Sequence, residues 1–388
     1  MIRRIFPILA LSIFSSMLGS GIVVPLLPLF AESLGASGLW LGMIFAGFPV
    51  TRTLFTPLFG RLSDRRGRKP FICIGLFAYA IISFAFVWAA DVYQLFLIRL
   101  VHGVSGAMIL PIAQAYVGDI SPLREEGKWM GYANAAFFSG FGFGPLMGGL
   151  VTEQLGMNVA FIAMGALNMI AFFIAVIFLP ETVHKGTTET ATLSFGEMRR
   201  SRTVTGLFGF RLALTLGRSS FFAFLPVFAA LTLGLKTNVI GIIMAIHILL
   251  MALLGIPGGR IADVVSRRAL VVLGGAASLV YLALIPQIAT FWPLLGLIIL
   301  GAVGNALAVP AASAIAVEEG RKFGMGTTLA AFNVAMSIGM AVGPILSGAI
   351  VDFVNIDAAF YFGAASILVG MAVFAWLTRP EANQTVTR

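Results

Sequence analysis

Several side chains that could bind charged groups lie inside long apolar runs of this chain. An arginine keeps its charge at any working pH, and burying a charge in a membrane costs roughly 2.5 to 3.5 kcal/mol on insertion scales. Such residues therefore usually serve a function. A substrate with a carboxylate or phosphate could supply the missing counter-charge. The arginine candidates for substrate binding are Arg52, Arg99, Arg211 and Arg218.

The depth and spacing of these arginines differ. Arg211 and Arg218 are seven residues apart and share one helix face, about 10 Å apart along the axis. Arg218 lies near the middle of its apolar run, and Arg99 lies nearer the outer side of the membrane. At both positions a functional role is favoured over a structural one. Arg52 and Arg211 lie within reach of the membrane surface, and for them extension of the side chain to the interface is an equal alternative.

Neutral polar residues accompany the arginines. They are mixed with Phe and Met, and this combination suits a large, partly apolar ligand. The neutral candidates for substrate binding are Gln114, Asn134, Asn305 and Asn333.

Proton transfer needs a group that titrates in the working range. The candidate is His102, because the reference pKa of histidine is about 6.5 and His102 shares a helix face with Arg99. Carboxylates lie near helix ends or in loops rather than at mid-membrane, so Asp119 and Glu32 are second choices. His247, alone on an apolar helix, is interpreted as a packing residue.

The elements that must position these residues are membrane helices. Of the 388 residues 59% are hydrophobic and 11% charged. Most of the chain divides into runs of about 20 apolar residues separated by short polar breaks. The sequence therefore predicts an all-α polytopic protein with twelve transmembrane helices. We expect an N-terminal six-helix bundle (1–179), a polar linker (180–203), a C-terminal six-helix bundle (204–379) and a tail (380–388).

The sequence lacks the residues that several other functional classes require. The net charge of +9 comes from loops rather than from one amphipathic face, so nucleic-acid binding is not predicted. The single cysteine excludes an internal disulfide and makes a zinc site unexpected. Catalytic triads, phosphate-binding loops and His/Glu metal motifs are absent from the sequence. We expect neither an enzyme nor a bound metal or cofactor.

The basic loops predict the orientation in the membrane. Lys and Arg remain on the cytoplasmic side of short loops. Lys236 is the one basic residue outside the apolar runs that falls on the other side. Both termini and the linker are therefore expected to be cytoplasmic, in the inner membrane of a bacterium.

The two predicted halves repeat each other with a constant offset. Gly60, Arg61 and Asp64 recur 199 residues later as Gly259, Arg260 and Asp263. The same offset pairs Gly42 with Gly241, Asn134 with Asn333, Gly144–Pro145 with Gly343–Pro344, and Gly149 with Gly348. Such a repeat predicts two pseudo-symmetric bundles with the substrate between them near the midplane.

Three motifs resemble those of the major facilitator superfamily. GRLSDRRGRKP (60–70) resembles its loop signature. RLVHGVSGA (99–107) resembles the fourth-helix motif, with His102 where a glutamine is usual. GFGFGPLMGGL (140–150) resembles the fifth-helix motif of the twelve-helix drug:proton antiporter group. The resemblance covers the whole chain and implies the fold of that superfamily.

The loop motif implies a conformational latch at the cytoplasmic ends of the helices. In the resemblance, Asp64 and its arginines clamp helices of both halves and stabilise an outward-facing state. The second copy departs from the motif, with Val264 and Ser266, so its latch is expected to be weaker. The alternative is that the basic loop only fixes topology. The latch candidates are Gly60, Arg61, Asp64, Arg65, Gly67, Arg68 and Asp263.

A glycine stripe marks the fifth predicted helix. Gly140, Gly144 and Gly148 recur every four residues, and Pro145 allows a bend. Close helix packing and a gating role are equally compatible with this stripe.

Taken together, the sequence predicts a secondary active transporter. The leading hypothesis is export of a small amphiphilic organic molecule by alternating access, coupled to protons by antiport, as in multidrug efflux. The alternative is an exporter or exchanger of organic anions, siderophore-like compounds or lysolipids, and a remote alternative is a transport-like membrane sensor. The expected partners are the lipid bilayer, the substrate and protons, and the chain is expected to act as a monomer.

Overall fold

A computed structural model describes residues 2–122, 125–181, 201–323 and 325–379, and all the regular structure in these residues is helical. Twelve of the described helices are long and apolar enough to cross a membrane, as predicted. The N-terminal helices are α1 (Ile2–Ser33), α2 (Gly38–Arg66), α3 (Arg68–Ala85), α4 (Val92–Ile120), α5 (Glu126–Leu155) and α6 (Met157–Phe178). The C-terminal helices are α8 (Arg202–Leu231), α9 (Thr237–Val264), α10 (Arg267–Leu284), α11 (Phe291–Phe323), α12 (Met325–Phe353) and α13 (Ile356–Leu377).

Short polar signals set the helix boundaries. The side chain of Asp91 accepts a hydrogen bond from the backbone N–H of Gln94 at the start of α4. At the start of α8, the side chain of Ser201 accepts one from the backbone N–H of Val204. Gly35 and Gly234 have φ angles of 76° and 62° in the turns before α2 and α9. These two turns are equivalent in the repeat, and both need a residue without a Cβ.

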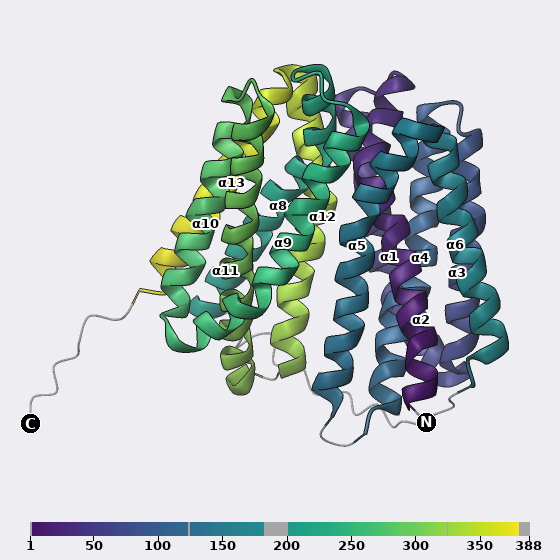
Figure 1. The fold of residues 1–388 in the computed structure, drawn as a ribbon. Helices are drawn as coiled ribbons and strands as arrows, with labels where there is room; N and C mark the ends of the chain where they lie inside the picture. Colours follow the sequence, from purple (N-terminus) through teal and green to yellow (C-terminus); the bar gives the residue numbers. More distant parts are fainter. Residues whose placement is uncertain (1, 123–124, 182–200, 324, 380–388) are drawn as a thin grey trace, which may run out of the picture.

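The helices form two bundles that stand side by side (Figure 1). In the first bundle α1 packs on α5 and α6, while α4 packs on α2 and α3. In the second bundle α8 packs on α12 and α13, while α11 packs on α9 and α10. The second set repeats the first, helix for helix, so the sequence repeat is also a packing repeat.

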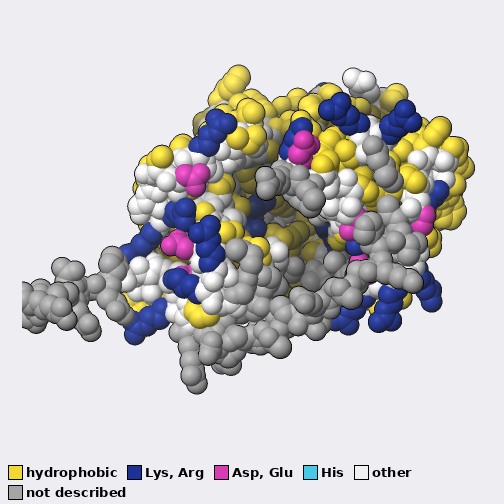
Figure 2. All heavy atoms as spheres, turned by 90° about the horizontal axis from the view of Figure 1, so that it is seen from below, with side chains coloured by type: hydrophobic (Ala, Val, Ile, Leu, Met, Phe, Trp, Pro, Cys, Tyr) yellow, Lys and Arg dark blue, Asp and Glu magenta, His cyan; other side chains and the backbone are white. Residues whose placement is uncertain are grey.

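The bundles contact each other chiefly through two helix pairs, α2 with α12 and α5 with α9. The contacts lie where α2 and α9 begin and where α5 and α12 end. We call this end of the molecule the closed face. The other end carries the α2–α3 and α9–α10 loops, and we call it the basic face. Viewed from below, the basic face shows a hollow between the bundles, with Lys and Arg side chains visible in it (Figure 2).

Candidate functional site

The N-terminal half holds two arginines against one aromatic ring. The guanidinium carbon of Arg99 lies 4.9 Å from the ring centroid of Phe48, and that of Arg52 lies 5.9 Å from it. Arg99 is buried, with its Nε donating to the backbone oxygen of Ile44 at 3.3 Å. Arg52 remains half-buried. Stacking on an aromatic face and bonding to a carbonyl partly replace the hydration that these cations lose.

Arg99 also fixes the state of His102. Its Nη1 lies 3.1 Å from His102 Nδ1, and a guanidinium can only donate. The Nδ1 atom must therefore accept, and the proton of the neutral imidazole is on Nε2. The ring is fully buried among Phe48, Tyr79 and Phe86, at centroid distances of 5.1, 4.2 and 5.8 Å. His102 thus lies behind Arg99 and is not exposed in the hollow.

The C-terminal half holds the other two arginines on one face of α8. Arg211 is buried, lies 4.8 Å from the ring centroid of Phe332 and donates from Nη2 to the sulfur of Met336 at 2.9 Å. Arg218 lies 5.7 Å from the ring centroid of Phe222, and its Nε has no hydrogen-bond partner. Arg218 remains half-buried, although α8 packs extensively on α12 and α13.

Counter-charges for these arginines are missing in the part of the chain that the structure describes. There, each ion pair within 4.0 Å joins residues near helix ends, and none includes Arg52, Arg99, Arg211 or Arg218. A cation in low dielectric attracts any mobile anion that can reach it. Of the four, Arg52 and Arg218 keep part of their surface exposed and are the best placed to do so.

His247, which the sequence analysis interpreted as a packing residue, forms a second cluster with Arg218 and Tyr281. Its ring centroid lies 6.0 Å from those of Phe222 and Tyr281, and Arg218 stacks on Phe222. His247 Nδ1 lies 3.2 Å from the carbonyl oxygen of Ile298, so Nδ1 donates and Nε2 is a bare acceptor. His247 Nε2, Tyr281 Oη and Arg218 Nε are buried and unpartnered in the structure. Sequence reasoning missed this cluster because its members come from α8, α9 and α10. The only signal was the presence of polar residues in the middle of three apolar helices.

The neutral candidates separate into two groups. Asn134 on α5 and Asn333 on α12 are exposed, and Gln114 on α4 is half-buried. Asn305 is fully buried and donates to the Gly301 carbonyl at 2.8 Å and to Ser278 Oγ at 3.4 Å. It therefore joins α11 to α10 and does not face the hollow.

The loop motif forms a charge triad inside the N-terminal half. Arg68 contacts Asp64 at 2.5 Å and Asp119 at 3.0 Å, and it donates to Ser63 Oγ at 2.9 Å. Asp119, a second-choice proton carrier, is therefore an ion-pair partner here. Gly67 has a φ angle of 96°, which lets α3 begin directly after α2.

The C-terminal half repeats this triad at the same offset. Arg267 contacts Glu318 at 3.0 Å but Asp263 only at 3.9 Å. The longer contact agrees with the divergence of the second motif. Both triads join residues of their own half, and around Gly60 the space is open to 4 Å. Exposed side chains in this loop include Arg61 and Arg65. The remaining proton-coupling candidate, Glu32, is also exposed and lies at the other end of the molecule.

The glycine stripe of α5 packs on α1 in the same half. A Cβ on Gly140 would lie 2.5 Å from the Phe14 carbonyl, one on Gly144 would lie 2.5 Å from Gly21 Cα, and one on Gly148 would lie 3.1 Å from the Ile22 carbonyl. The stripe thus allows two helices of one bundle to approach closely.

A different face of α5 joins the two halves at the closed face. A Cβ on Gly241 of α9 would clash with the Pro145 carbonyl, and one on Gly149 would lie 2.8 Å from the Thr237 carbonyl. We call this pair of contacts, together with its repeat below, the glycine–proline gate.

The second copy of the glycine–proline gate joins α2 to α12. A Cβ on Gly42 would clash with the Pro344 carbonyl, and one on Gly38 would lie 2.6 Å from the Gly348 carbonyl. The carboxylate of Asp352 accepts hydrogen bonds from the backbone N–H groups of Gly38 and Leu39, at 2.6 and 2.9 Å. The repeated residues Gly42, Gly241, Pro145, Pro344, Gly149 and Gly348 therefore lie where the halves meet.

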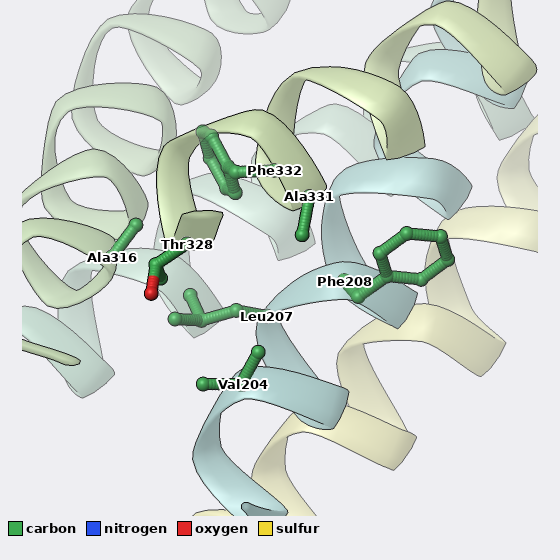
Figure 3. Close-up of a pocket in the computed structure, with 7 residues that line it drawn as sticks. All are labelled: Val204, Leu207, Phe208, Ala316, Thr328, Ala331 and Phe332. Carbon is green, nitrogen blue, oxygen red and sulfur yellow. The ribbon is translucent and has the colours of Figure 1, made fainter. Parts of the chain in front are cut away.

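A small pocket beside Arg211 is not the substrate site. It lies between α8, α11 and α12 and has a volume of about 10 Å³ (Figure 3). That volume has room for about one water molecule. Its lining residues are Val204, Leu207, Phe208, Ala316, Thr328, Ala331 and Phe332.

Relatives with similar sequences cover different shares of this chain. The chain is 27% identical to an uncharacterized MFS-type transporter of Methanocaldococcus jannaschii over 373 residues, which are 94% of this chain and 96% of that protein. It is 34% identical to the quinolone resistance protein NorA of Staphylococcus aureus over 177 residues, 46% of this chain and 45% of NorA.

Solved structures with the same fold have low sequence identity. A bacterial homolog of the human lysosomal transporter Spinster, in an inward-facing and occupied conformation, has a TM-score of 0.83 at 13% identity over 96% of each chain. The nucleoside transporter NupG has a TM-score of 0.81 at 15% identity, over 97% of this chain and 100% of NupG. The family model for the Major Facilitator Superfamily matches residues 9–238 and 212–388. The chain therefore belongs to the Major Facilitator Superfamily and is a multi-pass membrane transporter rather than an enzyme.

Proposed function

We propose that this protein exports a small amphiphilic organic molecule with an anionic group, by alternating access coupled to proton antiport. The observation that carries the proposal is the hollow between the halves together with the arginines that have no carboxylate partner among the described residues. Arg218 and Arg52 are the proposed contacts for the anionic group, with Asn134, Asn333 and Gln114 as neutral contacts. Export is supported by the similarity to the quinolone resistance protein NorA, and antiport by the resemblance of residues 140–150 to the fifth-helix motif of the drug:proton antiporter group.

The proposed orientation places the basic face in the cytoplasm of a bacterial cell. Arg61, Arg65, Arg66 and Lys69 surround the α2–α3 loop, and Arg267 and Arg268 begin α10 on the same face. Among the described residues near the closed face, Lys236 is the single basic one. With the positive residues inside, the hollow opens to the cytoplasm and the structure is inward-facing.

In the proposed cycle the glycine–proline gate opens when the basic face closes. The charge triads, which here stay within their own halves, then meet the opposite half as a latch. A charged side chain whose ion-pair partners differ between the two states biases the equilibrium by its differential contacts.

Asp64→Asn is expected to lower transport about tenfold or more, because the amide keeps the shape but loses the charge-assisted bond to Arg68. Asp263→Asn is the matched control and should have a smaller effect, since its contact with Arg267 is 3.9 Å. Both variants should be inserted and folded. Uptake of substrate into inverted proteoliposomes measures the effect, and full transport by the Asp64 variant would refute the latch.

The proposed proton carrier is His102, through its bond with Arg99. A protonated imidazole has no lone pair on Nδ1, so proton binding must break the 3.1 Å bond and release the guanidinium. Proton binding would thereby rearrange a cation beside the cavity.

His102→Gln tests this carrier. Glutamine can accept the Arg99 bond through its side-chain oxygen but does not titrate, so transport should become nearly independent of pH between 5.5 and 8, while substrate binding stays within about threefold. His247→Gln, at the other buried histidine, is the control and should retain the wild-type pH profile. A profile unchanged in the His102 variant would exclude this residue as the carrier.

The second candidate function is efflux of cationic drugs, which the resemblance of the fifth-helix motif to that of the drug:proton antiporter group favours. The two candidates make opposite predictions for a permanent cation. A fluorescent quaternary ammonium dye and a carboxylate of matched size would be compared in equilibrium binding to the purified protein. Preference for the carboxylate supports the anionic substrate, and preference for the dye supports the second candidate.

A further inference from the structure

A recess on the outer side of the N-terminal bundle combines two cations with an apolar wall. It lies at the basic face, where α1 and α3 begin and α6 ends, and has a volume of about 760 Å³. Arg4 and Lys69 supply the charges, and Ile177 and Phe178 supply apolar surface. The hollow between the halves is a different place, because α6 packs on α1 and α3 away from the C-terminal bundle.

The position of the recess in the fold sets its depth in the membrane. Arg4 is in the first turn of α1, Lys69 is the second residue of α3, and Phe178 is the last residue of α6. The recess therefore lies at the end of three spanning helices, where lipid headgroups meet acyl chains. Ile177 and Phe178 are 67% and 64% exposed, so the wall faces lipid.

The local charge balance is positive. The nearby acid is Glu181, which accepts a hydrogen bond from the backbone N–H of Lys69 at 3.4 Å and lies against Gly67. This carboxylate is held at the start of α3, and the side chains of Arg4 and Lys69 form none of the ion pairs found in the described residues. Among the described residues of the recess, two cations and one carboxylate leave one positive charge to pair with a phosphate.

We propose that this recess binds an anionic phospholipid, with its phosphate between Arg4 and Lys69 and an acyl chain along Ile177 and Phe178. Basic pockets between helix ends on the cytoplasmic side are suited to such headgroups, because nearby Lys and Arg side chains attract the negative phosphate. Lys69 directly follows Arg68 of the charge triad, so a lipid bound here contacts the segment that carries the latch. This binding does not depend on the transported substrate.

The test uses the full-length protein in nanodiscs of phosphatidylcholine with increasing phosphatidylglycerol. Native mass spectrometry of the released protein counts the retained lipids of each class. The wild type should retain one phosphatidylglycerol preferentially, and Arg4→Gln/Lys69→Gln should lower that preference about tenfold or more. The control Arg260→Gln/Arg321→Gln removes two exposed charges from the basic face of the other half and should retain the preference.

Two further measurements distinguish the ligand and protect against misfolding. Phe178→Ser keeps both cations and should shorten retention of phosphatidylglycerol by loss of the acyl contact, while added inorganic phosphate should not displace the lipid. Equal loss in the control variant, equal retention of both lipids by the wild type, or displacement by millimolar phosphate would overturn the proposal. Far-UV circular dichroism of each variant confirms that the helices are intact.

Discussion

Arg218→Gln is expected to weaken binding of an anionic amphiphile about 10- to 100-fold, the loss that follows when a hydrogen bond to a charged group is removed. Arg218 is the most telling of the four arginines. It lies deep in α8, has a buried Nε without a partner and keeps part of its surface exposed. The bound anion would supply the acceptor and the charge that the structure lacks around this side chain.

Arg218→Lys distinguishes charge from geometry. Lysine keeps the cation but loses the planar pair of donors, so it should rescue binding only in part if the contact is bidentate. Arg321→Gln removes an exposed arginine of the basic face and should leave affinity unchanged. Equilibrium binding of a fluorescent carboxylate to the purified variants measures the effect. Unaltered, tight binding of a quaternary ammonium dye to all variants would show that the arginines are structural.

The second large effect is expected at the glycine–proline gate. Gly42→Ala and Gly241→Ala each place a methyl group against a proline carbonyl of the opposite half. Overpacking of this kind costs roughly 1 to 3 kcal/mol for each site, so the double variant should shift the equilibrium away from closure by a factor of about 30 or more. Transport should fall because the protein no longer returns to the inward-facing state.

Gly255→Ala and Gly131→Ala are matched controls on α9 and α5, since nothing lies within 4 Å of a Cβ added at either glycine. Both should transport normally. Electron-spin distances between labels at Leu34 and Val354, in a Cys73→Ser background, report opening of the closed face. If the double variant keeps the wild-type distance distribution, the contact is not the gate.

The sequence by itself determined the helices and their number. The run of about 20 apolar residues that crosses a bilayer is a local property, and the constant offset of 199 residues predicted two similar bundles. The family, the twelve spans and the transporter class were confirmed. Helix ends were less certain, because α11 continues to Phe323, beyond its apolar run, and polar residues at a membrane surface extend a helix without an apolar signal.

The sequence also placed the arginines inside the membrane, but only the tertiary structure decided what each one meets. Arg99 and His102 share a face by spacing, and the structure joins them directly. Asn305 looked equivalent to the other polar candidates, yet its rotation turns it onto α10. His247 looked isolated in the sequence, but the structure packs it near Arg218 of α8 and Tyr281 of α10. The rotation of a helix about its axis and the helices that it contacts depend on packing across the bundle. The sequence pattern of a single helix does not specify either.

The gate shows the same division. The repeated Gly42, Gly241, Pro145 and Pro344 were visible in the sequence as a repeat without a role. In the structure the glycine of each half meets the proline carbonyl of the other, which requires two backbones to approach closely. The sequence shows that the two glycine positions lack side chains. Only the assembled halves decided which backbone fills the space, because that contact joins residues about 100 to 300 positions apart.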